Sequence, residues 1–158
     1  MNEVTLIQAL VHKIQYHLER SEENPFSCGI ISLYAAQCWV LNKQIQLPSI
    51  QISTVDAFQG NEKDLIILST VRSKSIGFTA DPRRLNVAIT RAKSQLIIIG
   101  NKRLLETNHL WCTILKTIAI NGKIIDSSEL TSLYLSICFT EFESHLRIYE
   151  DLKREQSP

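Results

Sequence analysis

Two short runs of the sequence, residues 65–71 (LIILSTV) and 95–100 (QLIIIG), are apolar at most positions. A strand that is apolar on both faces has to be covered on both faces, as the inner strands of a parallel sheet are. Two further runs of strand length, 27–33 and 50–55, precede them, and helical patterns separate the four runs. This alternation predicts an α/β domain with a mainly parallel sheet and helices on both faces.

Helical periodicity accounts for most of the sequence between these runs. Apolar residues recur at three- and four-residue steps over residues 3–20, which predicts an amphipathic helix. Asp81 and Pro82 suit the cap and first turn of another helix, over 83–92. We expect further helices over 35–46 and 102–120, the latter broken near Thr107 and Asn108.

The length of 158 residues is that of one ordinary domain. We divide the chain into residues 1–122, which hold the alternating elements, and a C-terminal flank over 123–158. In the flank we expect an edge strand over 123–126 after the Asn121-Gly122 turn, followed by mostly helix over 128–155.

Composition excludes several classes of protein. With 44% hydrophobic and 21% charged residues, the chain is neither disordered nor fibrous. No apolar run approaches the ~20 residues of a membrane helix, and the N-terminus lacks the pattern of a signal peptide. We therefore expect no membrane partner and a nuclear or cytoplasmic, not secreted, protein. The four cysteines form no C-x-x-C pair, so we predict buried, reduced thiols and no metal site: Cys28, Cys38, Cys112 and Cys138.

The net charge of +1 conceals an uneven distribution. Residues 72–103 contain eight basic residues and one acid, whereas residues 126–158 contain seven acids and three basic residues. A basic block in a neutral chain is a candidate phosphate-binding surface, although a charge run alone is more often a solvated face. Ligands of parallel sheets bind outside the carboxyl ends of the strands. We expect three polar clusters at those ends, 32–34, 56–62 and 70–74.

Three motifs make this pattern specific. They are GIISLYAAQ (29–37), STVDAFQGNEKD (53–64) with ILSTVR (67–72), and DPRRLNVAITRAK (81–93). In this order they resemble motifs IV, V and VI of the second RecA-like domain of superfamily 1B helicases, the nonsense-mediated-decay helicase group and its DNA-acting relatives. The resemblance runs from about residue 1 to about residue 115. Motif IV departs from the family, with Ser32-Leu33 in place of Thr-Pro and Cys38 in place of an arginine.

The resemblance implies a nucleotide site and a catalytic arginine. Arg91 matches the arginine finger, which stabilises charge on the transferred γ-phosphoryl group in comparable NTPases. The nucleotide-binding residues implied are Tyr34, Gln37, Gln59, Gly60, Glu62 and Arg84. Without the family, Gly60 reads as a turn residue, Glu62 as a surface acid and Tyr34 as a packed aromatic. Of Arg83 and Arg84, one is expected to pair with an acid of the domain. Asp56 is expected to hold backbone amides of its loop, and Phe58 to lie in the core.

The resemblance also implies contacts with single-stranded RNA or DNA. The matching residues are Thr54, Ser69, Thr70 and Arg72. Small hydroxyls and backbone amides can hold phosphates without reading bases, which suits a translocase. Read without the family, the hydroxyl residues are ordinary strand residues.

The parts that bind ATP and Mg²⁺ in such motors are missing from this sequence. It has no G-x-x-x-x-G-K-[ST] motif and no acidic run for magnesium, so ATP and Mg²⁺ would bind only together with a first RecA-like domain in cis. We therefore predict the second motor domain of an ATP-dependent 5′-to-3′ helicase, inactive alone, as a fragment, a truncated isoform or a degenerate copy. The alternatives are a non-catalytic module that binds nucleic acid or a protein partner, and an inactive relic.

Overall fold

The computed structural model describes residues 3–18, 26–71 and 75–125. Its sheet has four parallel strands in the order β2-β1-β3-β4. The strands are β1 (Cys28–Ser32), β2 (Ile50–Thr54), β3 (Lys63–Ser69) and β4 (Ala92–Ile99). The helices are α1 (Glu3–Leu18), α2 (Ala35–Gln44), α3 (Pro82–Ile89), α4 (Lys102–Leu105) and α5 (His109–Asn121), with a 3₁₀ turn over Gly77–Ala80. The predicted α/β class with a parallel sheet is confirmed.

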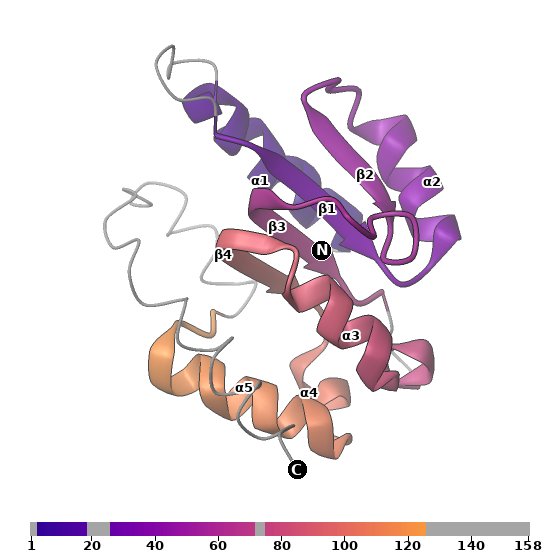
Figure 1. Cartoon of the computed structure of the whole chain (residues 1–158), viewed down its shortest axis with the longest axis vertical. Helices are drawn as coiled ribbons and strands as arrows, with labels where there is room; N and C mark the ends of the chain where they lie inside the picture. Colours follow the sequence, from indigo (N-terminus) through magenta and orange to yellow (C-terminus); the bar gives the residue numbers. More distant parts are fainter. Residues whose placement is uncertain (1–2, 19–25, 72–74, 126–158) are drawn as a thin grey trace.

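Helices cover both faces of the sheet (Figure 1). Successive side chains of a strand point to opposite faces, and the core divides accordingly into two layers. Ile30 and Ile67 pack with α1 and α2, whereas Ile31 and Ile66 pack with α3, α4 and α5. This arrangement explains why the inner strands are apolar throughout: β1 is buried at every position.

Helix boundaries follow the expected capping chemistry. The Asp81 carboxylate accepts hydrogen bonds from the backbone N–H groups of Arg83 and Arg84, and Pro82 opens α3. The predicted break in 102–120 is also present, because Asn108 caps α5 by accepting from the Trp111 N–H. Phe58 lies fully in the core, as predicted.

Three expectations about the helices and strands are wrong. The strand predicted at 95–100 begins at Ala92, and α3 ends at Ile89 instead of residue 92, because Ala92 pairs with Lys63 of β3. No strand forms over residues 123–125, where an edge strand was predicted. The helix expected over 128–155 lies outside the described residues.

Because all four strands are parallel, the sheet has two chemically distinct ends. We call the end where β3 and β4 begin, with Glu62, Lys63, Arg91 and Ala92, the amino edge. The opposite end, with Ser32, Thr54, Ser69 and Ile99, is the carboxyl edge.

Candidate functional site

Glu62 and Arg91 come together at the amino edge through the pairing of β3 with β4. Each residue immediately precedes its strand, and the first strand residues, Lys63 and Ala92, are register partners. The Lys63 N–H donates to the Arg91 carbonyl oxygen at 3.0 Å. The Glu62 side chain is exposed and the Arg91 side chain is half-buried. The fold therefore places an acid and a guanidinium, 29 positions apart in the sequence, at one accessible edge.

The Arg91 guanidinium lies against the end of α3, the helix that Arg91 follows. Its Nε donates to the Val87 carbonyl oxygen at 3.2 Å and its Nη2 to the Thr90 hydroxyl at 3.2 Å. The last carbonyl groups of a helix lack intrahelical donors and attract cations, so α3 provides a natural resting place for this charge. The two bonds use two of the five donors of a guanidinium.

The loop between β2 and β3 crosses from the carboxyl edge to the amino edge. The polar cluster 56–62 was expected at the carboxyl ends, but only its start lies there, because residue 62 immediately precedes the first residue of β3. Buried Phe58 anchors the loop on the sheet, and the Asn61 N–H donates to its carbonyl oxygen at 3.0 Å. Gln59 and Gly60 are therefore displayed on the outside of the loop, and both are exposed.

Position 60 favours glycine because of its backbone conformation, and not because neighbouring atoms leave no room for a side chain. Its φ angle is +84°, in the region that glycine adopts without steric cost. A Cβ atom built at this position would meet no protein atom within 4 Å. The space outside Gly60 is therefore open to a ligand, on the same loop as Glu62.

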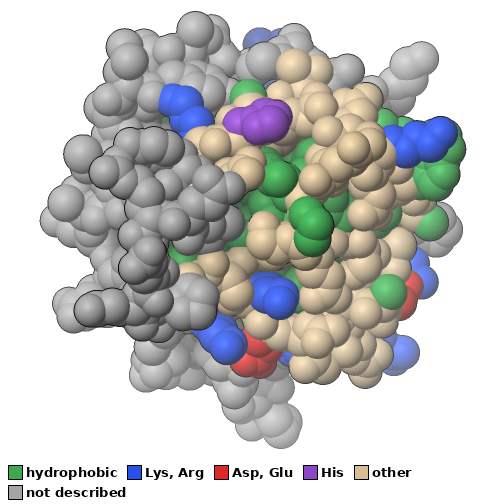
Figure 2. Space-filling view, turned by 90° about the horizontal axis from the view of Figure 1, so that it is seen from above, with side chains coloured by type: hydrophobic (Ala, Val, Ile, Leu, Met, Phe, Trp, Pro, Cys, Tyr) green, Lys and Arg blue, Asp and Glu red, His purple; other side chains and the backbone are tan. Residues whose placement is uncertain are grey.

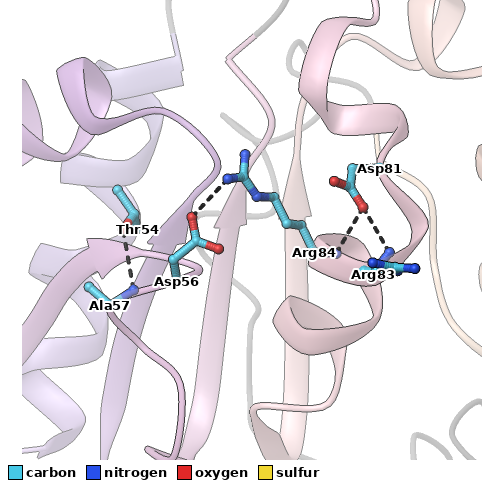
Figure 3. A network of polar contacts seen from close by, with 6 residues as sticks. All are labelled: Thr54, Asp56, Ala57, Asp81, Arg83 and Arg84. Carbon is cyan, nitrogen blue, oxygen red and sulfur yellow. Dashed lines mark hydrogen bonds and ion pairs between the residues drawn. The ribbon is translucent and has the colours of Figure 1, made fainter.

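Arg84 pairs with an acid, as expected for one of the two arginines that open α3. Its Nη2 lies 3.1 Å from the Asp56 Oδ2 (Figure 3). The Ala57 amide at this loop is held by the Thr54 hydroxyl at 3.4 Å, a role expected of Asp56. Figure 3 shows the Arg84 side chain extending from α3 toward the loop after β2. Arg84 thus connects the two motif segments.

The other predicted residues lie at the carboxyl edge, away from Glu62 and Arg91. Tyr34 caps α2 without a side-chain hydrogen bond to the first turn, and its own N–H donates to the Ser32 hydroxyl at 3.2 Å. The Gln37 Nε2 donates to the Ser69 hydroxyl at 3.2 Å. The structure therefore does not bring Tyr34 and Gln37 together with Gly60, Glu62 and Arg91.

Two of the three hydroxyl residues predicted to hold a nucleic-acid strand are buried. Ser69 and Thr70 are fully buried, whereas Thr54 is half-buried. The Thr70 Oγ1 has no hydrogen-bond partner and lies against Gly100, where a built Cβ would approach it to 2.1 Å. Arg72 lies outside the described residues.

Glu3 is a polar residue at the carboxyl edge that the sequence reading did not single out. Its Oε2 accepts from the Ser69 hydroxyl at 2.6 Å and from the Val71 N–H at 2.9 Å. Burial raises the pKa of Glu3 above its ordinary value, and the two hydrogen bonds partly offset this. An acid in the first turn of a helix is expected, because a negative charge is favourable near a helix N-terminus. Its position in the sequence therefore does not indicate the contact with Ser69 and Val71.

The described part of the chain gives no sign of a metal centre. Residues 3–18, 26–71 and 75–125 contain no group of three His, Cys, Asp or Glu side chains able to hold an ion. Burial raises the pKa of the Cys28 thiol to about 12 and also raises that of Cys38, so both are poor ligands and nucleophiles. Cys112 is half-buried, and Cys138 lies outside the described residues. Among the described helices, none is long and apolar enough to cross a membrane.

The basic residues of the block that the structure describes lie on several elements. Arg83 and Arg84 belong to α3, Lys93 to β4, and Lys102 and Arg103 to α4. On the face of the molecule seen in Figure 2, lysine and arginine side chains are scattered, with hydrophobic side chains visible between them.

This parallel sheet, covered on both faces and carrying the three motif segments in order, defines a RecA-like domain of superfamily 1 helicases. The sequence model of the family described as "AAA domain" matches residues 1–103. The chain belongs to this family, and its homologues are helicases of the Upf1 and Sen1 type.

Three relatives illustrate the similarity. The chain is 45% identical over 118 residues to the "Putative regulator of nonsense transcripts 1" of Takifugu rubripes, covering 68% of this chain and 11% of that protein. It is 38% identical over 138 residues to "Helicase sen1" of Schizosaccharomyces pombe, covering 80% and 8%. It is 34% identical over 150 residues to "ATP-dependent helicase upf1" of the same yeast, covering 87% and 16%. The chain thus spans a small part of the length of these relatives.

Proposed function

We propose that this chain is the second motor domain of an ATP-dependent 5′-to-3′ helicase or translocase, with Arg91 as its arginine finger. The observation that carries the proposal is the meeting of Glu62 and Arg91 at the amino edge, with open space outside Gly60. Two of the relatives are named helicases, which supports the same reading.

In this proposal the amino edge faces a first RecA-like domain, and ATP and Mg²⁺ bind between the two. The guanidinium of Arg91 fits the charge of a triphosphate, and the exposed Gly60 and Gln59 allow close approach of the loop. Mg²⁺ would be held by the first domain, because this sequence has no acidic run of the kind that binds the ion in such motors. Arg91 would exchange its bonds to Val87 and Thr90 for the γ-phosphoryl oxygens, where its planar donors stabilise developing charge.

Arg84 has a different proposed role from Arg91. Its ion pair with Asp56 holds the loop against α3, so that Glu62 approaches the ribose and Arg91 the phosphates from one rigid unit. Tyr34 and Gln37, at the other edge, would contribute to nucleotide binding only through the position of α2. The motifs alone imply that Tyr34 and Gln37 contact the nucleotide directly, whereas the proposal includes no such contact.

The carboxyl edge is the proposed contact for single-stranded RNA or DNA. Thr54 and Arg72 would touch the strand, while the buried Ser69 and Thr70 would shape the backbone from which the amides project. A nuclear or cytoplasmic location suits this activity.

A graft into a relative tests the proposal. The residues of the fission-yeast "ATP-dependent helicase upf1" that align with this chain are replaced by those of this chain, and ATP hydrolysis is measured with and without single-stranded RNA. We expect hydrolysis in the graft and a loss of about 10³-fold or more with Arg91→Ala. Arg83→Ala, in the first turn of α3, is the matched control and should retain activity.

Undiminished turnover in the Arg91→Ala graft would sink the finger assignment. A folded graft that binds RNA but hydrolyses no ATP, even with Arg91 intact, would favour the non-catalytic binding module. In that case, RNA binding by the 158-residue chain should weaken steeply with salt, whereas a protein-binding module would be salt-insensitive.

A further inference from the structure

The carboxylate of Glu3 joins the start of α1 to the end of β3. It accepts hydrogen bonds from the Ser69 hydroxyl at 2.6 Å and the Val71 N–H at 2.9 Å. These partners are 66 and 68 positions away in the sequence. Hydrogen bonds to a carboxylate are shorter and stronger than those between neutral groups, so this contact is a firm one.

Val71 has a backbone conformation that needs outside support. Its φ angle is +67°, and among the described residues it is the one non-glycine residue with positive φ. For a β-branched side chain this region is strained and persists only where the surroundings impose it. The Thr70 N–H still donates to Ile99 of β4, whereas the next N–H, that of Val71, turns away from the sheet to Glu3. The chain therefore leaves the sheet at Val71 along a path that Glu3 fixes.

Ser69 ties this turn to two other elements. The Gln37 Nε2, from α2, donates to the Ser69 hydroxyl at 3.2 Å, and the Ser32 hydroxyl, at the end of β1, donates to the Ser69 carbonyl oxygen at 3.3 Å. Ser69 itself is fully buried; its bond with Ser32 is buried and its bond with Gln37 is partly buried. Helices α1 and α2 thus converge on the residue that precedes the turn.

We propose that Glu3 is a positioning residue, which holds Val71 in its left-handed conformation and thereby fixes the backbone of residues 69–71 at the carboxyl edge, where a strand would bind. This inference rests on the proposed function, because it takes the carboxyl edge as the nucleic-acid contact. It assigns Glu3 no contact with nucleic acid. If Glu3 acts only in this way, removing its negative charge weakens the binding of a polyanion. Charge repulsion alone predicts the opposite result.

The test compares matched charge removals in the 158-residue chain. Glu3→Gln keeps the shape of the side chain, and Glu106→Gln removes an exposed acid that pairs with Lys102 on α4. Binding of fluorescein-labelled oligo-uridine and oligo-deoxythymidine is measured by anisotropy at several salt concentrations. Exchange of the Val71 amide hydrogen is followed by NMR in the same samples.

We expect Glu3→Gln to weaken oligonucleotide binding and to speed Val71 exchange by about tenfold or more, as befits the loss of a charge-assisted hydrogen bond. Glu106→Gln should change neither, or tighten binding slightly. Adding Val71→Gly to Glu3→Gln should restore much of the binding, because glycine adopts positive φ without support. This rescue separates positioning from a general loss of stability.

Tighter binding by Glu3→Gln would overturn the inference, since Glu3 would then act as a competing negative charge. Unchanged Val71 exchange in Glu3→Gln would overturn it as well, whatever the binding result. If the wild-type chain binds neither oligonucleotide, the proposed strand contact fails, and the exchange rate still decides whether Glu3 holds Val71.

Discussion

The guanidinium of Arg84 lies 3.1 Å from the carboxylate of Asp56 and ties α3 to the loop after β2. These residues belong to two different motifs, 28 positions apart. The pair is partly exposed, with 36% of the Arg84 side chain and 63% of the Asp56 side chain accessible. The pair is therefore more important for geometry than for stability, because it fixes the position of the loop that carries Glu62 relative to α3, the helix that precedes Arg91.

A double-mutant cycle should detect this pair. We expect the double variant Asp56→Asn/Arg84→Gln to lose less free energy of unfolding than the two single variants lose in sum. The difference, the coupling free energy, should be roughly 0.2–1 kcal/mol, as for other exposed ion pairs. Urea unfolding monitored by circular dichroism provides the free energies. In the control cycle, Asp56→Asn with Arg83→Gln, the effects should add. Additivity in both cycles would contradict the pairing.

Gly29 leaves no room for a side chain. A Cβ at this position would lie 2.6 Å from the Cζ of Phe58, which is fully buried. We expect Gly29→Ala to lower the free energy of unfolding by about 1–3 kcal/mol through overpacking, and Phe58→Leu to relieve part of this cost in the double variant. Gly60→Ala is the control: its cost comes from positive φ, so Phe58→Leu should not relieve it. Equal behaviour of the two alanine variants would argue against the contact.

Trp111 holds the 3₁₀ turn over Gly77–Ala80 through a buried hydrogen bond. Its indole Nε1 donates to the Thr79 carbonyl oxygen at 2.7 Å. Trp111→Phe keeps an aromatic ring but leaves that carbonyl unpaired, which should cost about 1–3 kcal/mol in thermal or urea unfolding. Trp39→Phe is the matched control, because Trp39 is 60% exposed and should change stability little. Similar losses in both variants would contradict this role.

The Asp64 carboxylate should give stability a defined pH dependence. Its partial burial works to raise its pKa, but the hydrogen bonds from Ser27 and the charge of Lys93 outweigh this and hold the pKa below the ordinary 3.8. A lowered pKa in the folded state means that this stabilisation is complete above pH 3.8 and is lost as the pH falls through the folded-state value. We expect the stability gap between wild type and Asp64→Asn to be widest near neutral pH and to shrink in strong acid. A gap independent of pH would refute the assignment.

Local sequence signals predicted the elements of this fold well. The β-branched runs form strands, Asp81 caps the start of α3 as predicted, and the helix break predicted near Asn108 falls where Asn108 caps α5. The boundary of β4 was misplaced by three residues, because Ala92 joins the sheet through its partner Lys63 and not through its own propensity. The edge strand expected after the Asn121-Gly122 turn does not form over 123–125, since a turn and a short run of strand-forming residues do not by themselves supply a neighbouring strand.

The candidate site was predictable as a set of residues but not as an arrangement. The motif strings identified Gly60, Glu62 and Arg91 by resemblance. That Tyr34 and Gln37 lie at the opposite edge, and that Glu3 meets Val71, follow from strand direction and from the packing of α1 on the sheet.

By itself, then, the sequence determined the α/β class, the order of strands and helices, the helix caps and the family. These properties depend on periodicity, capping chemistry and motif spacing, all of which are local in the chain. Only the tertiary structure decided which residues share an edge, which hydroxyls are buried and which arginine pairs with Asp56. Those outcomes depend on strand register and on contacts between residues far apart in the sequence, whose free energies exist only once the sheet has formed.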